Sequence, residues 1–249
     1  MAQAGQSVLA GQRLLAGQSV LVVGGGRHLG AAVARAAAAA GAGVVIGARD
    51  VQRAAAVAAG LPGARAIRLD VADEETVAAA AAELGGVDHV VVTAAAHHNV
   101  PVAQLEHDRV VAALEAKVVG PMLLAKHLAP TMPSTGSFVL FSGVAAWAPA
   151  AGYTVMGITN GAVSFLARHL AKELAPIRVN AISPGIVDSG TWDELGPDGK
   201  RGLLEAAAAS NLAGRAGTSD DVVEAVLWLL GAGFVSGETI HVEGGARHA

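Results

Sequence analysis

Short apolar runs alternate with longer alanine-rich segments along most of the chain. Runs rich in valine and isoleucine are typical of buried strands, and they cover 19–24, 43–48, 64–71, 87–94, 136–142, 177–183 and 238–244. Helical spacing of apolar residues favours helices at 29–41, 50–60, 73–85, 104–130, 152–175 and 220–231. This alternation requires parallel strand pairing through right-handed crossovers. It therefore predicts a single-domain α/β fold, a doubly wound, mostly parallel sheet with helices on both faces (Rossmann fold).

Local signals refine these boundaries. Asp50 is a candidate N-cap for the second helix. The segment 188–201 combines proline, glycines and mixed charges, so we expect an irregular loop there. At the start, three tandem six-residue copies (AGQSVL, AGQRLL, AGQSVL) cover 4–21. We interpret residues 1–15 as an N-terminal extension, a local duplication without a function, and residues 16–249 as the dinucleotide-binding domain with its substrate pocket.

Composition narrows the possible partners. Hydrophobic residues make up 53% of the chain and aromatic residues 3%, so the core is aliphatic. Charged residues are only 15% and the net charge is −4, which offers no basic surface for nucleic acid or an anionic membrane. The absence of cysteine excludes disulfides and thiolate chemistry and favours a cytoplasmic location. No histidine–carboxylate spacing suggests a metal site.

A glycine-rich turn, VVGGGRHLG (22–30), joins the first strand to the first helix. Such a turn places backbone N–H groups and the positive end of a helix against a pyrophosphate. Its place at the start of the β/α alternation strengthens the prediction of a dinucleotide site.

The segment YTVMGITNGAVSFLARHLAKELAPIRVNAISPG (153–185), together with this turn, resembles the short-chain dehydrogenase/reductase family. The resemblance extends over roughly 15–245. The family's glycine pattern keeps its first and third glycines as Gly24 and Gly30, while His28 replaces the middle one. His28 either narrows the site or donates a hydrogen bond to a phosphate; alternatively, neighbouring glycines relax the loop around it.

The resemblance implies further cofactor contacts in chain order. They come from the turn, from the ends of later strands and from the Pro-Gly segment after 177–183. The residues that match are Gly24, Arg27, His28, Leu29, Gly30, Asp70, Val71, Ala94, Pro184, Gly185, Ile186 and Ser189.

Charge at the end of the second strand bears on the choice of cofactor. An NAD site places an acidic residue there to bind the ribose 2′-OH, but this chain has Ala48 followed by Arg49. Arg49 and Arg27 suit a 2′-phosphate, because arginine binds phosphate in a forked, charge-assisted way. The sequence therefore predicts NADP(H), unless either arginine is only a solvated surface charge.

The positions that carry the chemistry in the family are all changed. The family's Tyr and Lys align with Met156 and Asn160, its Ser with Gly143, and its Asn with Lys117. A thioether cannot donate a proton and glycine has no hydroxyl. The standard mechanism therefore cannot run unchanged.

Four residues are candidates for replacement roles. Lys117 and Asn160 look like an exchanged pair, with Lys117 supplying the positive charge; alternatively, Lys117 has drifted in an unused site. Tyr153 is the only tyrosine, three residues before the usual position. It acts either as a catalytic hydroxyl or, more simply, as a wall of the pocket. Ser142 is a weaker stand-in, because neighbouring residues of a strand point to opposite faces.

Two functions remain open. The first is an atypical NADP(H)-dependent oxidoreductase that transfers hydride to or from a small carbonyl- or imine-type substrate. The second is a non-catalytic or repurposed member that binds a ligand or partner, or runs a non-redox reaction. Trp147, Met156 and Trp192 predict an apolar pocket and hence an apolar small-molecule substrate. Oligomers are usual in the family, so we expect a homodimer or homotetramer.

Overall fold

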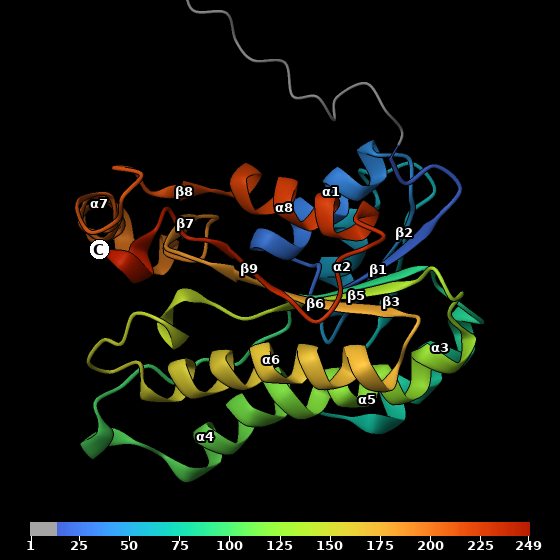
Figure 1. Cartoon of the computed structure of the whole chain (residues 1–249), viewed down its shortest axis with the longest axis horizontal. Coiled ribbons are helices and arrows are strands. Elements are labelled where there is room, and N and C mark those ends of the chain that lie inside the picture. The colour runs from blue at the N-terminus through green and yellow to red at the C-terminus, as the bar shows by residue number, and fades with distance from the viewer. Residues whose placement is uncertain (1–13) are drawn as a thin grey trace, which may run out of the picture.

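The computed structural model describes residues 14–249, and Figure 1 shows them as three layers. The central layer is a seven-stranded sheet in the order β3-β2-β1-β4-β5-β6-β9, and every neighbouring pair is parallel. Its strands are β1 (Ser19–Val23), β2 (Gly43–Ala48), β3 (Arg65–Arg68), β4 (His89–Val92), β5 (Ser137–Phe141), β6 (Arg178–Pro184) and β9 (Thr239–Val242). The predicted doubly wound fold is confirmed.

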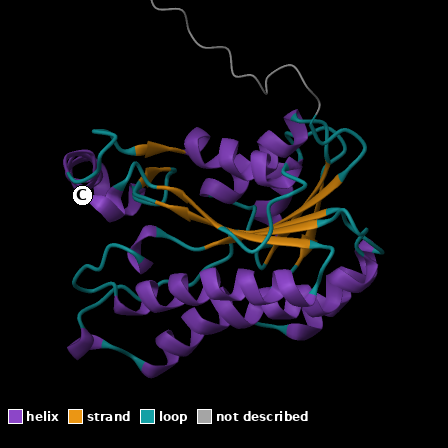
Figure 2. Ribbon diagram, in the orientation of Figure 1, coloured by secondary structure: helices purple, strands orange, loops and turns teal. Residues whose placement is uncertain are grey.

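Helices cover both faces of the sheet (Figure 2). On one face lie α1 (His28–Ala39), α2 (Val51–Ala58) and α8 (Ser219–Gly231). On the other lie α3 (Glu74–Leu84), α5 (Gly120–Leu128) and α6 (Thr154–Glu173), with α4 (His107–Leu114) against α6. Two aliphatic cores form, one under each helical layer, because strands of a parallel sheet bury both faces. The alanine-rich face of α1 permits close packing against the sheet and α8.

Two boundaries differ from the sequence prediction. The segment 188–201 is not wholly irregular, because α7 (Gly196–Ala209) begins within it, with proline in its first turn, where proline is tolerated. A short pair of parallel strands, β7 (Val187–Asp188) and β8 (Gly217–Thr218), also lies beside it. The packed domain starts earlier than residue 16, because Leu15 is fully buried and its N–H donates to Ala40 O (3.0 Å). The first six-residue copy lies outside the described residues.

A buried polar network ties strands together at the amino ends of β4 and β5. His89 Nδ1 lies 2.8 Å from Ser137 Oγ, and its Nε2 lies 3.3 Å from Gln18 Oε1. Burial, with a smaller contribution from the charge of Arg178, lowers the pKa of His89 from 6.5 to about 4, although Asp88 opposes the change. His89 is therefore neutral in the folded protein near pH 7.

This network predicts a specific loss of stability in acid. Between pH 6.5 and about 4 the unfolded chain binds a proton at His89 that the folded chain excludes. The stabilising effect of neutral His89 is complete above pH 6.5 and falls by about 3 kcal/mol as the pH reaches 4. We expect His89→Gln to flatten the free energy of unfolding over this window, measured by urea titration at several pH values. Exposed His169→Gln is the control; parallel curves for wild type and His89→Gln would contradict the assignment.

Candidate functional site

The glycine-rich turn links the end of β1 to the start of α1 with two residues in the left-handed region. Gly24 has φ of +85° and His28 has φ of +50°. Side chains seldom adopt positive φ, whereas glycine does so without cost. His28 thus keeps the backbone turn of the glycine that it replaces. Histidine in place of glycine therefore adds an imidazole side chain to the turn and leaves the backbone conformation of the turn unchanged.

The turn packs tightly against the end of β4. A Cβ added at Gly30 would lie 2.4 Å from Gly24 O and 2.6 Å from Thr93 Oγ1. A Cβ added at Gly24 would lie 2.8 Å from Ala94 N. The Thr93 hydroxyl is itself fixed, because it donates to Val23 O (3.0 Å). The predicted residues Gly24, Gly30 and Ala94 therefore lie together, and we call this tight contact of the turn with the end of β4 the glycine cradle. The role of Thr93 could not be predicted from the sequence, because it depends on a contact between residues that are distant in the chain.

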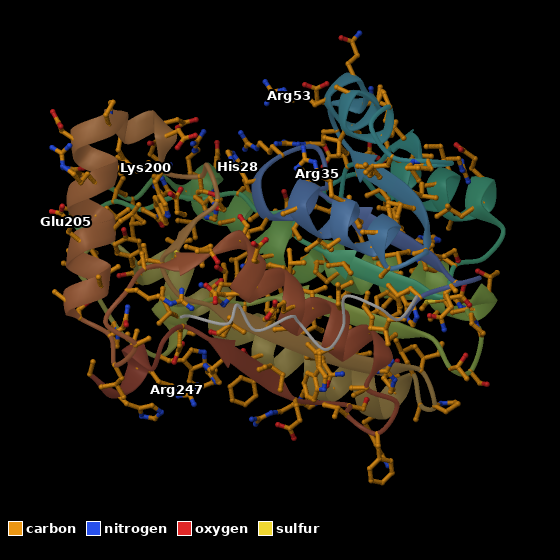
Figure 3. All side chains as sticks on the ribbon, turned by 90° about the horizontal axis from the view of Figure 1, so that it is seen from above. His28, Arg35, Arg53, Lys200, Glu205 and Arg247 are labelled. Atoms are coloured by element: carbon orange, nitrogen blue, oxygen red, sulfur yellow. The ribbon has the colours of Figure 1, made fainter. Side chains whose placement is uncertain are left out.

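The start of α1 and the segment after β6 share one groove. An open groove of about 610 Å³ is lined by Arg27, His28 and Ser189, and it continues along α1 past Arg35. A Cβ at Gly190 would lie 3.0 Å from His28 Nδ1, so the ring of His28 reaches the second segment. Figure 3 shows His28 and Arg35 along α1, with Lys200 of α7 beyond His28. Two sets of predicted cofactor residues thus lie side by side.

The end of β2 is followed by arginine side chains, and the carboxylate nearest to them in the sequence is already hydrogen-bonded. Arg49 is exposed directly after Ala48, where β2 ends. Asp50 is engaged, because its Oδ1 accepts from Arg53 N (3.1 Å) and its Oδ2 pairs with Arg53 Nε (2.9 Å), which confirms it as the α2 cap. Within residues 14–249, neither Arg27 nor Arg49 forms an ion pair. Both guanidinium groups remain available to an anion.

The remaining predicted cofactor residues lie at strand ends on the same edge of the sheet. After β3, Asp70 Oδ1 accepts from Ala72 N (3.1 Å), and Val71 is buried. After β6, Gly185 N donates to Val242 O (2.9 Å), and Ile186 O accepts from Gly217 N. The Ser189 hydroxyl lies 3.0 Å from that of Thr191. Leu29 is partly buried at the start of α1.

Lys117 is a buried amine at the end of β5. It lies in a single π-helical turn (Glu115–Val119) between α4 and α5, and such turns are frequent at functional sites. Its Nζ donates to Phe141 O (2.7 Å) and Ser142 O (3.4 Å). The side chain is 8% exposed, and burial lowers the pKa of Lys117 to about 8. No carboxylate pairs with it in the described part of the chain.

Asn160 and Gly143 lie against each other just after this strand end. A Cβ at Gly143 would lie 2.7 Å from Asn160 Nδ2. Asn160 is 3% exposed, and its Oδ1 has no hydrogen-bond partner among the described residues. Lys117 and Asn160 therefore both lie against residues 141–143, without a hydrogen bond between their side chains. The steric dependence between positions 143 and 160 is not visible in the sequence, because it needs the helix placed on the strand.

Ser142 is turned away from this space. Its Oγ donates to Asn160 O (2.8 Å) and accepts from Ser164 Oγ (3.1 Å). The hydroxyl therefore fixes α6 to β5. This placement fits the expected alternation of side chains along a strand and gives Ser142 a structural task.

Three further polar residues lie in loops near this strand end: Tyr153 before α6, and His97 and His98 after β4. Tyr153 is the N-cap residue of α6, outside the helix, and its hydroxyl makes no hydrogen bond within residues 14–249. His98 is buried, and its Nε2 accepts from Glu106 N (3.1 Å), so it holds the loop. Loss of solvent, and then the charges of Lys117 and Arg27, lower the pKa of His97. His97 therefore lies within electrostatic range of both the glycine turn and Lys117.

Residues 24–247 match a family described as enoyl-(acyl carrier protein) reductase. The short-chain dehydrogenase/reductase ucsE from Acremonium sp is 31% identical over 248 residues, covering 91% of this chain and 94% of the relative. A small-chain dehydrogenase solved in complex with NADPH has 29% identity and a TM-score of 0.82, with coverage of 93% and 100%. MalC reductase/Diels-Alderase from Malbranchea aurantiaca has 27% identity and a TM-score of 0.86, with coverage of 94% and 98%.

The described residues contain neither a candidate membrane-spanning helix nor a candidate metal site. No helix there is both long and apolar enough to cross a membrane. Within 14–249, histidine and acidic side chains do not gather in groups of three or more that could hold a metal ion.

The glycine cradle predicts a position that tolerates no side chain. We expect Gly30→Ala to lower the free energy of unfolding by about 1–3 kcal/mol, because its methyl group would collide with a main-chain oxygen and a fixed hydroxyl. Gly202→Ala is the matched control: it lies in α7 with open space around it and should be neutral or stabilising. Urea titration measures both, and equal effects at the two glycines would refute the cradle.

Proposed function

The chain belongs to the short-chain dehydrogenase/reductase family, and we propose that it is an NADP(H)-dependent oxidoreductase with a non-standard active site. The observation that carries the proposal is the built nucleotide cradle of Gly24, Gly30 and Thr93. A tight turn that leads into a helix N-terminus without a side-chain cap suits a pyrophosphate.

The preference for NADP(H) rests on charge. Arg27 and Arg49 flank the place where an adenosine ribose would lie, and the acid that follows Arg49, Asp50, is occupied as a helix cap. A 2′-phosphate would find two guanidinium groups at the end of β2, where an NAD site places an acid. The NADPH complex of the structural relative is consistent with this choice. When bound, the reduced nicotinamide supplies a hydride.

Lys117 supplies the positive charge in the part of the site where the substrate would react. Its ammonium is buried without an acid beside it, and its lowered pKa makes it a proton donor near neutral pH. Met156 and Gly143 can supply no proton, and Ser142 is turned away. Trp192 is fixed by donation from its Nε1 to Val187 O (3.0 Å), and with Trp147 it provides apolar surface. We propose a small, apolar carbonyl- or imine-type substrate.

A second function is favoured by one observation: all four positions that carry the family's chemistry are replaced. In this version the same pocket binds a ligand or partner, or runs a reaction without net redox change. The relative described as a reductase/Diels-Alderase is a protein of this fold named for both kinds of activity. The charged Lys117 separates the two, because a pocket without chemistry gains nothing from burying an ammonium group.

The proposed assembly is a homodimer or homotetramer. Ile158 and Phe165 of α6 are 61% and 60% exposed, and Val119 and Met122 near α5 are exposed as well. Apolar side chains of this size on neighbouring helices suit contact with a second copy of the chain.

Fluorescence titration with NADPH and NADH, followed by a panel of carbonyl and imine substrates, tests the function. Tight NADPH binding with turnover is the expected result. Failure to bind either nucleotide would overturn the oxidoreductase proposal, and NADPH binding without turnover would favour the second function.

The arginines predict a change in cofactor preference. We expect Arg27→Ala and Arg49→Ala each to raise the Kd for NADPH by about 10- to 100-fold, because each removes a charge-assisted contact of about 1.5–3 kcal/mol. The Kd for NADH should change little. Exposed Arg109→Ala on α4 is the control. Equal weakening of NADPH and NADH would show that neither arginine reads the 2′-phosphate.

Lys117 predicts a pH profile. Reduction needs the ammonium form, so kcat/KM for reduction should fall as the pH rises through about 8. We expect Lys117→Met, which fills the same space without charge, to lower kcat/KM by about 10²- to 10⁴-fold and to remove this titration. Circular dichroism confirms that the variant folds. A folded Lys117→Met enzyme with the wild-type profile would exclude Lys117 from the chemistry.

A further inference from the structure

The side-chain amide of Asn160 is a buried polar group without a protein partner. The residue is 3% exposed, and its Oδ1 is buried without a hydrogen-bond partner within residues 14–249. Leaving a buried amide unpaired costs about 1–3 kcal/mol. Two nearby hydroxyls are engaged elsewhere: Ser142 and Ser164 bond to each other and to the main-chain oxygen of Asn160. The described residues thus supply no partner for this amide oxygen.

Gly143 makes this arrangement possible. Its backbone is extended (φ 166°, ψ 157°), which any residue can adopt, so backbone conformation does not require glycine. Space does: a Cβ at this position would come within 2.7 Å of Asn160 Nδ2 and 3.3 Å of Cγ. The amide thus occupies the space that a serine side chain at residue 143 would fill. The two residues act as one sterically matched pair.

We propose that the Asn160 amide binds the reacting oxygen of the substrate, a ketone or aldehyde in one direction and an alcohol in the other. This inference rests on the proposed oxidoreductase function and narrows its substrate class. Asparagine combines a donor and an acceptor in one neutral group. Nδ2 donates to a carbonyl oxygen, and Oδ1 accepts from the hydroxyl that replaces it. The amide therefore satisfies both oxidation states without changing its own charge.

The surroundings favour this oxygen as the ligand atom. Asn160 and Lys117 approach the same strand end, residues 141–143, so a proton donor and an oxygen-binding amide belong to one site. A ribose hydroxyl of the cofactor is the competing partner for Asn160. The two differ in measurable ways, because loss of a ribose contact weakens nucleotide binding, whereas loss of a substrate contact lowers the rate.

Asn160→Ala tests the role directly. We expect kcat for ketone reduction to fall by about 10²-fold, as for other lost oxygen-binding donors, and the Kd for NADPH to stay within twofold. Unchanged kcat would overturn the proposal. So would a tenfold rise in the Kd for NADPH with kcat retained, which would assign Asn160 to the ribose.

A double-mutant cycle with Gly143→Ser tests the matched pair. Alone, Gly143→Ser should lower the Tm by about 5 °C through the clash with the amide, and it should lower activity. In the Asn160→Ala background the same change should cost no stability and restore activity at least tenfold, because a serine hydroxyl then has room to donate. Additive Tm changes without rescue would refute the pairing.

A third measurement needs no turnover. In protein saturated with NADP⁺, which cannot reduce a ketone, the ¹⁵N side-chain signals of Asn160 are identified by their loss in Asn160→Ala. We expect these signals to shift when cyclohexanone is added and not with NADP⁺ alone. A shift with the nucleotide alone, or none with saturating ketone, would overturn the proposal. Failure of the nucleotide to bind at all is seen separately by fluorescence and counts against the proposed function itself.

Discussion

The close contact of the β1–α1 turn with the end of β4 is the constraint on which the rest of the site depends. Gly24 and Gly30 leave no space for side chains against Thr93, and Thr93 is bonded back to Val23. This contact fixes where α1 begins, and therefore where its N-terminus points. Parallel pairing then brings the ends of β4, β5 and β6 to the same edge. Because these strand ends meet at one edge, the residues proposed to bind the cofactor and those proposed to act on the substrate can belong to one site.

Most of the fold could be predicted from the sequence because its signals are local. Alternating apolar runs fix the strands, and Asp50 caps α2 as its position suggests. The segment that contains α7 was less predictable, since its proline and glycines are typical of a loop, although proline is equally suited to a first helical turn. The candidate site likewise has a part that the sequence predicts and a part that it does not. The glycine turn has a sequence signature, whereas the orientation of Ser142 toward Ser164 and the fit of Asn160 to Gly143 require the packed helix.

Lys117 illustrates how burial and hydrogen bonding oppose each other. Removing an ammonium from water favours the neutral amine, and this effect lowers its pKa to about 8. Two main-chain carbonyls favour the charged form and keep the group at the strand end. The π-helical turn lets the side chain reach those carbonyls. The result is an amine that can hold or release a proton near neutral pH, whereas an exposed lysine would stay charged.

The relation between Gly143 and Asn160 bears on whether the site is abandoned or altered. In an abandoned pocket, substitutions at the two positions would be independent, and an unpaired amide would have no reason to be buried. Here the residue at 160 fills the space that a side chain at 143 would need, so position 143 has no room for a side chain while Asn160 is present. Such complementarity, beside a buried amine that is held by two carbonyls, is characteristic of a site rebuilt around a ligand. Under the proposed function, the loss of the tyrosine and serine chemistry is one part of a coordinated replacement.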